Sequence, residues 1–169
     1  MKRTLLLLII LYGFLSACSN NHRKLVQAED LSNQLMTLWE TGDDSGIDHI
    51  FSPEASYTDM ANNHTFHGIA EISSYVQHIH SWGSDIQMQI NNMQLADSHA
   101  YIEWTLTAKQ SKPIGTMVTV ATHKSITLNG VSLIEIKAGK IIKATDYMDV
   151  LGFILQLGSE VKLPGSSTD

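Results

Sequence analysis

The sequence predicts an α+β domain in which helices come first and a curved antiparallel sheet follows. Apolar residues recur at helical spacing over residues 24–41 and again after Gly68, which indicates amphipathic helices. From Asp85 onward apolar and polar residues alternate between short turn sequences, which is typical of strands. Helices packed across the open side of such a sheet would enclose a pocket, and 169 residues suffice for one domain of this kind.

The N-terminus has the layout of a bacterial export signal. Lys2 and Arg3 precede an uncharged run over residues 4–17, whose 14 residues fall short of the ~20 in a membrane-spanning helix. The run ends in Leu15-Ser16-Ala17-Cys18, which resembles the lipobox of bacterial lipoproteins, where the cysteine is lipid-modified and becomes the first residue. An ordinary secretory signal with an incidental cysteine is the alternative. Cys18 is the only cysteine, so it has no intramolecular disulfide partner.

A lipoprotein signal would divide the chain into four parts. These are a signal peptide at 1–17, lipidated Cys18 with a tether to residue 23, a folded domain at 24–161 and a disordered tail at 162–169. Without the signal 9 basic and 17 acidic residues remain, and an acidic surface repels nucleic acid and anionic headgroups. We therefore expect no nucleic-acid partner and membrane attachment through the lipid. Ser19, where an aspartate would favour inner-membrane retention, favours the outer membrane facing the periplasm.

Three helices are expected before the sheet and one short helix after it. The first covers residues 24–41 and ends at Gly42, the second lies within 43–51, and the third follows Gly68. The last helix is predicted in the apolar stretch VLGFILQLG at 150–158, directly after an aspartate that could cap it.

The strands are bounded by turn sequences. A short strand at 55–60 leads into a polar loop at 61–64, and Pro53 forces the chain to turn before it. Asn129-Gly130 between two alternating runs is a strong hairpin signal. The long strands are predicted at 85–96, 99–109, 116–128, 131–137 and 140–146, with turns at Asp97-Ser98, Asn129-Gly130 and Ala138-Gly139.

The last strand carries a carboxylate on its apolar face. Alternation places Asp146 on one face with Ile142, Ala144 and Met148, whereas Lys143 on the other face suits solvent. A charged carboxylate facing the core is costly unless it is paired or protonated, and burial raises its pKa toward the range useful for proton transfer. Asp146 is therefore the main candidate for a functional acid, with a purely structural aspartate bonded to Tyr or Trp donors as the alternative.

Other residues are candidates with equally simple structural alternatives. Asp59 is either a second functional carboxylate or a turn residue, and Asp149 either binds a ligand or caps the last helix. Trp104 is either a pocket wall or core, and His123 lies on a small-residue face that could line the pocket or the surface. The predicted set is Asp146, Asp59 and His123 for catalysis, and Trp104, Tyr147, Asp149 and Tyr57 for ligand binding.

No metal or organic cofactor is expected. His78 and His80 are two residues apart on a predicted helix and diverge, and His64 and His67 flank a loop with no cysteine ligand available. The sequence also has no glycine-rich phosphate loop and no serine nucleophile elbow.

The C-terminal segment is similar to the end of SnoaL-like polyketide cyclases. Residues 129–158, NGVSLIEIKAGKIIKATDYMDVLGFILQLG, have the strand, Gly-Lys-Ile turn, acid-bearing strand and closing helix of that family. Residues 42–76 resemble the wider superfamily of ketosteroid isomerase, scytalone dehydratase and nuclear transport factor 2. The resemblance covers about residues 25–158 and implies a cone-shaped sheet with a pocket, and a domain that can form a homodimer.

The resemblance also implies roles for the acids. In SnoaL-like cyclases an aspartate near the end of the last strand is the general acid/base of an aldol ring closure, which corresponds to Asp146, with Asp149 as second choice. In ketosteroid isomerase the base ends the first strand, where Asp59 stands. Leu35 replaces the isomerase tyrosine, Thr107-Ala108-Lys109 replaces a Gly-Thr-His of many cyclases, and Thr145 replaces a tryptophan before the final acids.

Three functions remain open from the sequence. The first is a cofactor-independent enzyme for aldol cyclisation, isomerisation, dehydration or epoxide opening on a small apolar substrate. The second is a periplasmic binder of a small apolar ligand, with Asp146 as a hydrogen-bond anchor. The third is an interaction module that pairs through its open sheet face.

Overall fold

The computed structural model describes residues 2–116 and 118–160, with side chains from residue 21 onward, and in this part of the chain six strands curl around helices. In chain order the elements are α1 (Lys2–Thr41), α2 (Ile47–Ile50), β1 (Phe51–Asp59), β2 (His64–His67), α3 (Gly68–Trp82), β3 (Gly83–Leu95), β4 (His99–Gln110), β5 (Ser125–Lys137), β6 (Lys140–Met148) and α4 (Val150–Gln156). The predicted α+β class is confirmed. The predicted tail at 162–169 lies outside the described residues.

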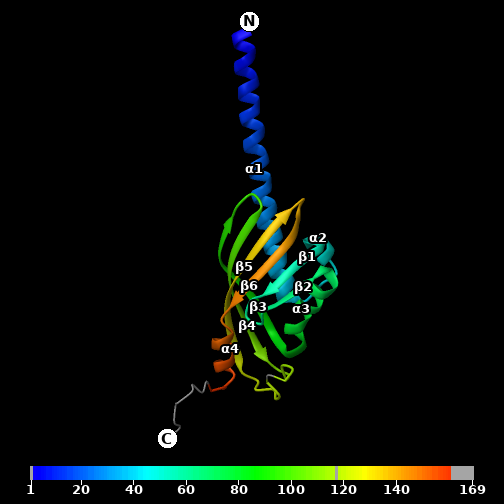
Figure 1. Ribbon diagram of the computed structural model, residues 1–169. Helices are drawn as coiled ribbons and strands as arrows, with labels where there is room; N and C mark the ends of the chain where they lie inside the picture. The colour runs from blue at the N-terminus through cyan, green and yellow to red at the C-terminus, as the bar shows by residue number, and fades with distance from the viewer. Residues whose placement is uncertain (1, 117, 161–169) are drawn as a thin grey trace.

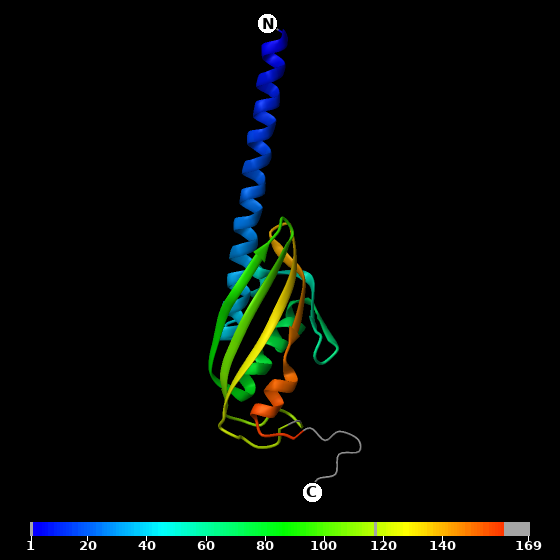
Figure 2. The same ribbon diagram turned by 90° about the vertical axis from the view of Figure 1, so that its left-hand side faces the viewer.

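The strands form one sheet in the order β2-β1-β6-β5-β4-β3. Because β2 and β3 are its two edges, the curled sheet stays open rather than closing into a barrel. Neighbours are antiparallel except for β1 and β6, which are parallel. The sequence predicts antiparallel strands throughout, but β1 and β6 are joined by no hairpin turn that would impose that direction. Figure 2 shows α1 and α3 inside the curve, and α4 at the end farthest from the N-terminus.

Helix α1 buries the stripe that its spacing predicts. It ends at Thr41 because Gly42 adopts a left-handed φ of 66° and its N–H bonds the carbonyl of Leu38. It begins at Lys2, so the predicted signal and first helix form one element that projects from the domain in Figure 1. No helix in the described residues has both the length and the apolar character needed to cross a membrane. The buried residues of the stripe include Ala28, Leu31, Leu35, Leu38 and Trp39.

The hairpin predicted at Asn129-Gly130 is wrong. Strand β5 continues through both residues, and Gly130 pairs with Trp104 on β4 and Met148 on β6. A Cβ atom at Gly130 would lie 2.4 Å from the Trp104 ring. The glycine is therefore required by the close approach of an indole to the backbone, and not by a turn.

Most of the strand predicted at 116–128 is instead a loop that precedes β5. The buried side chain of Gln110 orders this loop, because its amide donates to the Val120 carbonyl and accepts from the Thr122 hydroxyl. Ile114 and Val118 form an isolated bridge within the loop. The side chain of one buried glutamine thus supplies hydrogen bonds to this loop, which a neighbouring strand would supply in a sheet.

The two strands that carry the acids also depart from the simplest pattern. Ile141 is buried and Ile142 is half-buried, the reverse of the prediction, because the β5–β6 register shifts beside Glu135. Strand β1 begins at Phe51 and includes Pro53 near another register shift, and the unpredicted β2 pairs with its end as a hairpin.

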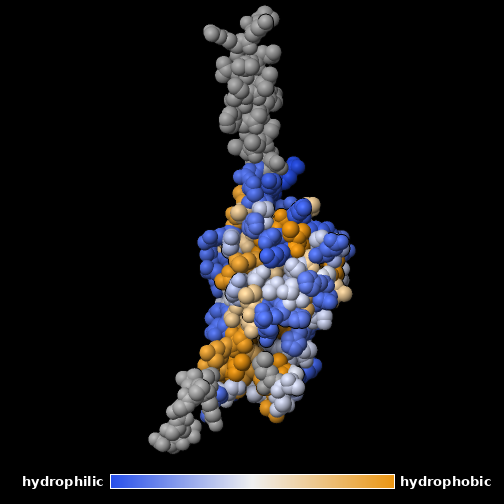
Figure 3. Space-filling model, viewed as in Figure 1, coloured by the Kyte–Doolittle hydropathy of each residue, from blue (hydrophilic) through white to orange (hydrophobic). Residues whose placement is uncertain are grey.

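Helix α4 closes the far end of the domain and leaves part of itself exposed. Phe153 is buried, whereas Leu151 and Leu155 are 56% and 47% exposed. Figure 3 shows an apolar area at this end of the molecule.

Candidate active site

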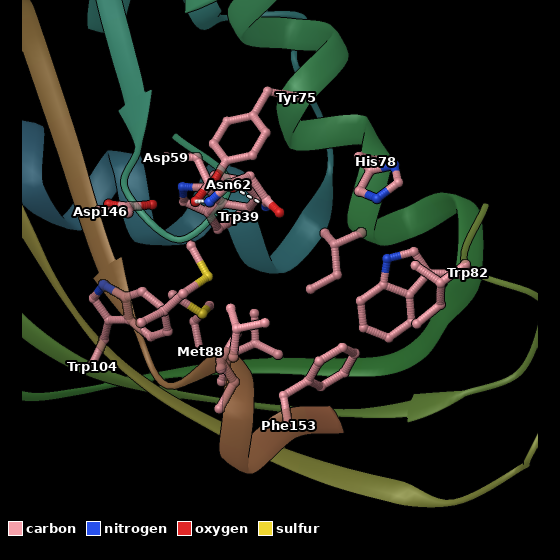
Figure 4. A pocket seen from close by; sticks show the side chains of 16 residues that line it. Trp39, Asp59, Asn62, Tyr75, His78, Trp82, Met88, Trp104, Asp146 and Phe153 are labelled. Atoms are coloured by element: carbon pink, nitrogen blue, oxygen red, sulfur yellow. Dashed lines mark hydrogen bonds between the residues drawn. The ribbon is translucent and has the colours of Figure 1, made fainter. Parts of the chain in front are cut away.

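A cavity of about 140 Å³ lies between the curved sheet and helices α1, α3 and α4. Figure 4 shows its two acids at one end and Trp82 and Phe153 toward the other. All three tryptophans of the chain line it, together with Tyr75 and Phe153. Asn62 and His78 are the exposed members of the lining and mark its rim.

The parallel pairing of β1 and β6 brings the two acids together. Asp59 and Asp146 are direct register partners, and the Met60 N–H donates to the Asp146 carbonyl at 3.0 Å. Neighbouring strands lie about 4.8 Å apart, and partners in register point to the same face. Both side chains are 3% exposed and both line the cavity.

The Asp146 carboxylate is held from both sides by hydroxyl groups. Ser132 donates to its Oδ1 at 2.6 Å, and Tyr57 donates to its Oδ2 at 2.8 Å. Each hydroxyl in turn accepts an indole N–H, from Trp104 at 2.9 Å and from Trp39 at 3.0 Å. Because an indole N–H can only donate, it leaves the hydroxyl proton free for the carboxylate. Two matching relays therefore orient Asp146 and support its ionised form.

Burial outweighs this support. Removal from water raises the pKa of Asp146 from 3.8 to about 7, the hydroxyls of Ser132 and Tyr57 oppose the shift, and the charge of Asp59 adds to it. A carboxyl group with a pKa near neutrality exchanges its proton readily in both directions at physiological pH. Asp146 can therefore act as a base or, once protonated, as an acid.

Asp59 has a different set of partners. Its Oδ1 accepts the backbone N–H groups of Ala61 and Asn62 at 2.9 and 3.1 Å, and its Oδ2 accepts the Asn62 side chain at 2.6 Å. The aspartate therefore shapes the β1–β2 turn, as its structural alternative predicted, while it also lines the cavity.

Tyr75 brings a hydroxyl group near both acids. Its ring is perpendicular to the Trp39 ring, with centroids 5.0 Å apart, and stacks on Phe66. Burial raises the pKa of Tyr75, and the charges of Asp146 and Asp59 raise it further. The hydroxyl therefore stays protonated and is a hydrogen-bond donor beside the acids, as Figure 4 indicates by its position.

The structure places three of the predicted site residues elsewhere. His123 lies on the exposed loop before β5, where no strand directs it inward. Tyr147 is 49% exposed on the outer face of β6, because it alternates with Asp146. Asp149 is exposed and caps α4, with its carboxylate accepting the Gly152 N–H at 2.8 Å. None of the three lines the cavity.

Trp104 does line the cavity, and Tyr57 lies beside it as a partner of Asp146. The sequence did not predict Trp39 and Ser132 as members of the relays, or Tyr75 and His78 as residues that line the cavity. Ser132 could have been found, because alternation from Ile134 places it on the inner face. The helical residues looked like ordinary core, and spacing alone does not separate a core tryptophan from a cavity wall.

The described residues offer no cluster of three or more His, Cys, Asp or Glu side chains that could hold a metal ion. The side chains that line the cavity support proton transfer, hydrogen bonding and apolar contact.

Comparison with known proteins identifies the family. Residues 33–144 match the SnoaL-like domain family. This match ends two residues before Asp146. No curated protein matches the chain.

Solved structures share the fold at low identity. The proposed hydroxylase AclR from Streptomyces galilaeus has a TM-score of 0.70 and 16% identity, over 83% of this chain and 91% of that one. A proposed SnoaL-like polyketide cyclase from Shewanella putrefaciens has a TM-score of 0.68 and 15% identity, over 78% and 96%. A Catenulispora acidiphila protein with a ketosteroid isomerase-like fold, in complex with trimethylamine, has a TM-score of 0.65 and 16% identity, over 76% and 92%. The fold and the match over most of the domain agree, and the chain belongs to the SnoaL-like domain family.

Proposed function

We propose that the protein is a cofactor-independent acid–base enzyme whose proton-transfer group is Asp146. The observation that carries the proposal is the Asp146 carboxyl group, which is buried at the end of an apolar cavity and has its pKa raised to about 7. Such a group removes a proton from a carbon next to a carbonyl and becomes a carboxylic acid. It then returns that proton to the product carbon, as in isomerisation, or to the new alkoxide, as in aldol closure.

Tyr75 is the proposed partner of Asp146 in this chemistry. Its protonated hydroxyl can donate to the substrate oxygen on which negative charge develops when the proton is removed. The two hydroxyl relays keep Asp146 oriented, so little reorganisation is needed during the reaction.

The size of the cavity restricts the substrate. An enclosed apolar space of about 150 Å³ holds one benzene-sized molecule. The cavity of about 140 Å³ therefore suits a substrate, or the reacting part of one, of about one ring.

The proposal can be tested with a probe that needs one base and no cofactor. 5-Nitrobenzisoxazole loses its ring C–H proton to a base, its N–O bond breaks, and a coloured nitrile phenolate forms. We expect kcat/KM to rise with pH and to level off above about 7, because Asp146 reacts only when ionised. Asp146→Asn should lower it about a hundredfold or more.

Two variants serve as controls. Glu54→Gln makes the same change of charge on an exposed residue of β1 and should leave the rate unchanged. His78→Gln at the cavity rim should leave the pH midpoint of kcat/KM unchanged. The pKa of Asp146 is set by burial, by the hydroxyls of Ser132 and Tyr57 and by the charge of Asp59, and not by His78. A rate that survives in Asp146→Asn would contradict Asp146 as the base. A wild-type rate no higher than that of buffer would contradict the enzyme and favour a binding protein in which Asp146 anchors a ligand.

We further propose that Cys18 carries a lipid that holds the domain at the outer membrane, on its periplasmic side. The lipobox-like sequence supports this, and so does α1, which runs unbroken from Cys18 to Thr41. Residues 18–27 precede Ala28, the first buried residue in the described part of α1, and at 1.5 Å per residue they would form a helical spacer about 15 Å long. Metabolic labelling with an alkyne fatty acid should mark the wild type and not Cys18→Ala. Equal labelling would contradict the anchor.

A further inference from the structure

In the part of the chain that the structure describes, the two acids of the cavity have no basic partner. Among the described residues, neither Asp59 nor Asp146 has a lysine, arginine or histidine within ion-pair distance. No lysine or arginine lines the cavity, and His78 stands at its exposed rim. Buried negative charge is costly when hydrogen bonds alone compensate it. A positive charge on a ligand would relieve that cost.

The other side chains that line the cavity are suited to binding a cation with an apolar surface. Five Trp, Tyr and Phe side chains line the cavity, and aromatic faces attract ammonium groups most strongly where water is excluded. The N–H groups of Trp39 and Trp104 are directed to the hydroxyls of Tyr57 and Ser132. The positive ends of these two indoles therefore point at the hydrogen-bond network and do not oppose a cation in the cavity.

The proposed chemistry has the same requirement. Removing a proton from a neutral carbonyl compound creates a new negative charge on the substrate, close to Asp59. A neighbouring ammonium group on that substrate would offset the repulsion. A carboxylate or phosphate ligand would meet two acids and no cation.

We propose that the natural ligand is a small apolar molecule carrying a protonated or quaternary ammonium group, which sits among the aromatic rings beside Asp59 and Asp146. This inference rests on the proposed function only in placing ligand and chemistry in the same cavity. Binding of the cation requires no turnover.

Three probes of nearly the same shape separate the alternatives. Choline is cationic, 3,3-dimethylbutan-1-ol is neutral and 3,3-dimethylbutanoate is anionic. Because every tryptophan of the chain lines the cavity, intrinsic fluorescence of the full chain in non-ionic detergent reports occupancy. We expect choline to bind at least about tenfold more tightly than the alcohol, and the anion more weakly still. Equal or weaker binding of choline would overturn the inference.

A matched pair of variants tests the role of charge. Asp59→Asn should weaken choline binding severalfold while the affinity for the alcohol, which reports an intact cavity, stays within about twofold. Glu54→Gln, which is exposed on the same strand, should change neither. If the Asp59 variant misfolds, the ratio of choline to alcohol affinity in the wild type still decides. A strong preference without turnover of the benzisoxazole would refute the enzyme and keep the ligand class. Turnover without the preference would do the reverse.

Discussion

Asp59 and Asp146 are partners on adjacent strands, equally buried and facing one cavity, yet they are held in different ways. Asp59 accepts three N–H groups from its own turn, so it is bound to the local backbone. Asp146 accepts two hydroxyl groups from distant parts of the chain, each backed by a tryptophan. The same side chain is therefore a turn former in one position and a group available for proton exchange in the other.

The difference shows that environment, rather than residue type, assigns the roles. Hydroxyl groups can reorient and can also accept a hydrogen bond, so they tolerate both protonation states of Asp146, whereas N–H groups only donate. The negative charge of Asp59 also raises the pKa of its neighbour. Each of the following variants changes one side of this comparison.

The largest expected effect is on how the free energy of unfolding depends on pH. The pKa of Asp146 rises from 3.8 to about 7 on folding, so between about pH 4 and 7 the folded state keeps a proton that the unfolded state has lost. Unfolding then releases a proton, and the free energy of unfolding falls as pH rises through this window, by on the order of 4 kcal/mol. Asp146→Asn should remove this loss and become more stable than the wild type at pH 8.

Urea unfolding of both proteins at several pH values measures this effect. The difference between wild type and Asp146→Asn cancels the titration of groups that the variant does not touch. It should be small at pH 4, change steadily to about pH 7 and then remain constant. A difference independent of pH would mean that Asp146 is not desolvated, and the contrast between the acids would disappear.

An intermediate effect is expected where the backbone makes room for Trp104. In Gly130→Ala the new methyl group would lie 2.4 Å from the indole ring and 2.8 Å from the Tyr147 carbonyl, so the ring must move. Overpacking of this kind costs about 1–3 kcal/mol. The movement should also break the bond from Trp104 to Ser132 and shift the pH midpoint of the elimination reaction upward, because Ser132 then supports the ionised acid less well.

Gly46→Ala is the matched control for this substitution. Gly46 has an ordinary φ of −109°, and a Cβ there would meet open space, so its stability should change by no more than about 0.5 kcal/mol. If Gly130→Ala behaves like Gly46→Ala, the tryptophan relay has no part in holding Asp146.

Gly130 also shows which parts of the fold the sequence could predict. The helical stripes, the inward direction of Asp146 and the Ala138-Gly139 turn follow local periodicity, and the structure has them. Asn129-Gly130 has the composition of a turn, but a tryptophan on the neighbouring strand decides its role. Periodicity also gave no warning of the β6 bulge, which depends on pairing with β5.

The candidate site also has residues that the sequence could predict and features that it could not. Asp59, Asp146 and Trp104 could be proposed from strand alternation and family resemblance, and all three line the cavity. Their proximity could not be predicted, because it depends on the parallel register of β1 and β6. His123 was placed on a strand that does not form, and Tyr75 comes from a helix whose rotation relative to the sheet is set by packing.

The smallest expected effect is on the Asp59 side. Asn62→Ala removes the side-chain donor to Oδ2 but leaves the two backbone N–H donors to Oδ1. Loss of one hydrogen bond at the partly exposed rim should cost about 1 kcal/mol, and the exposed Asn92→Ala on β3 should cost less. The pH midpoint of the elimination should stay within about half a unit, since no donor to Asp146 is lost. A larger shift would mean that the two carboxylates titrate as one coupled pair, and the separate roles assigned to them would have to be merged.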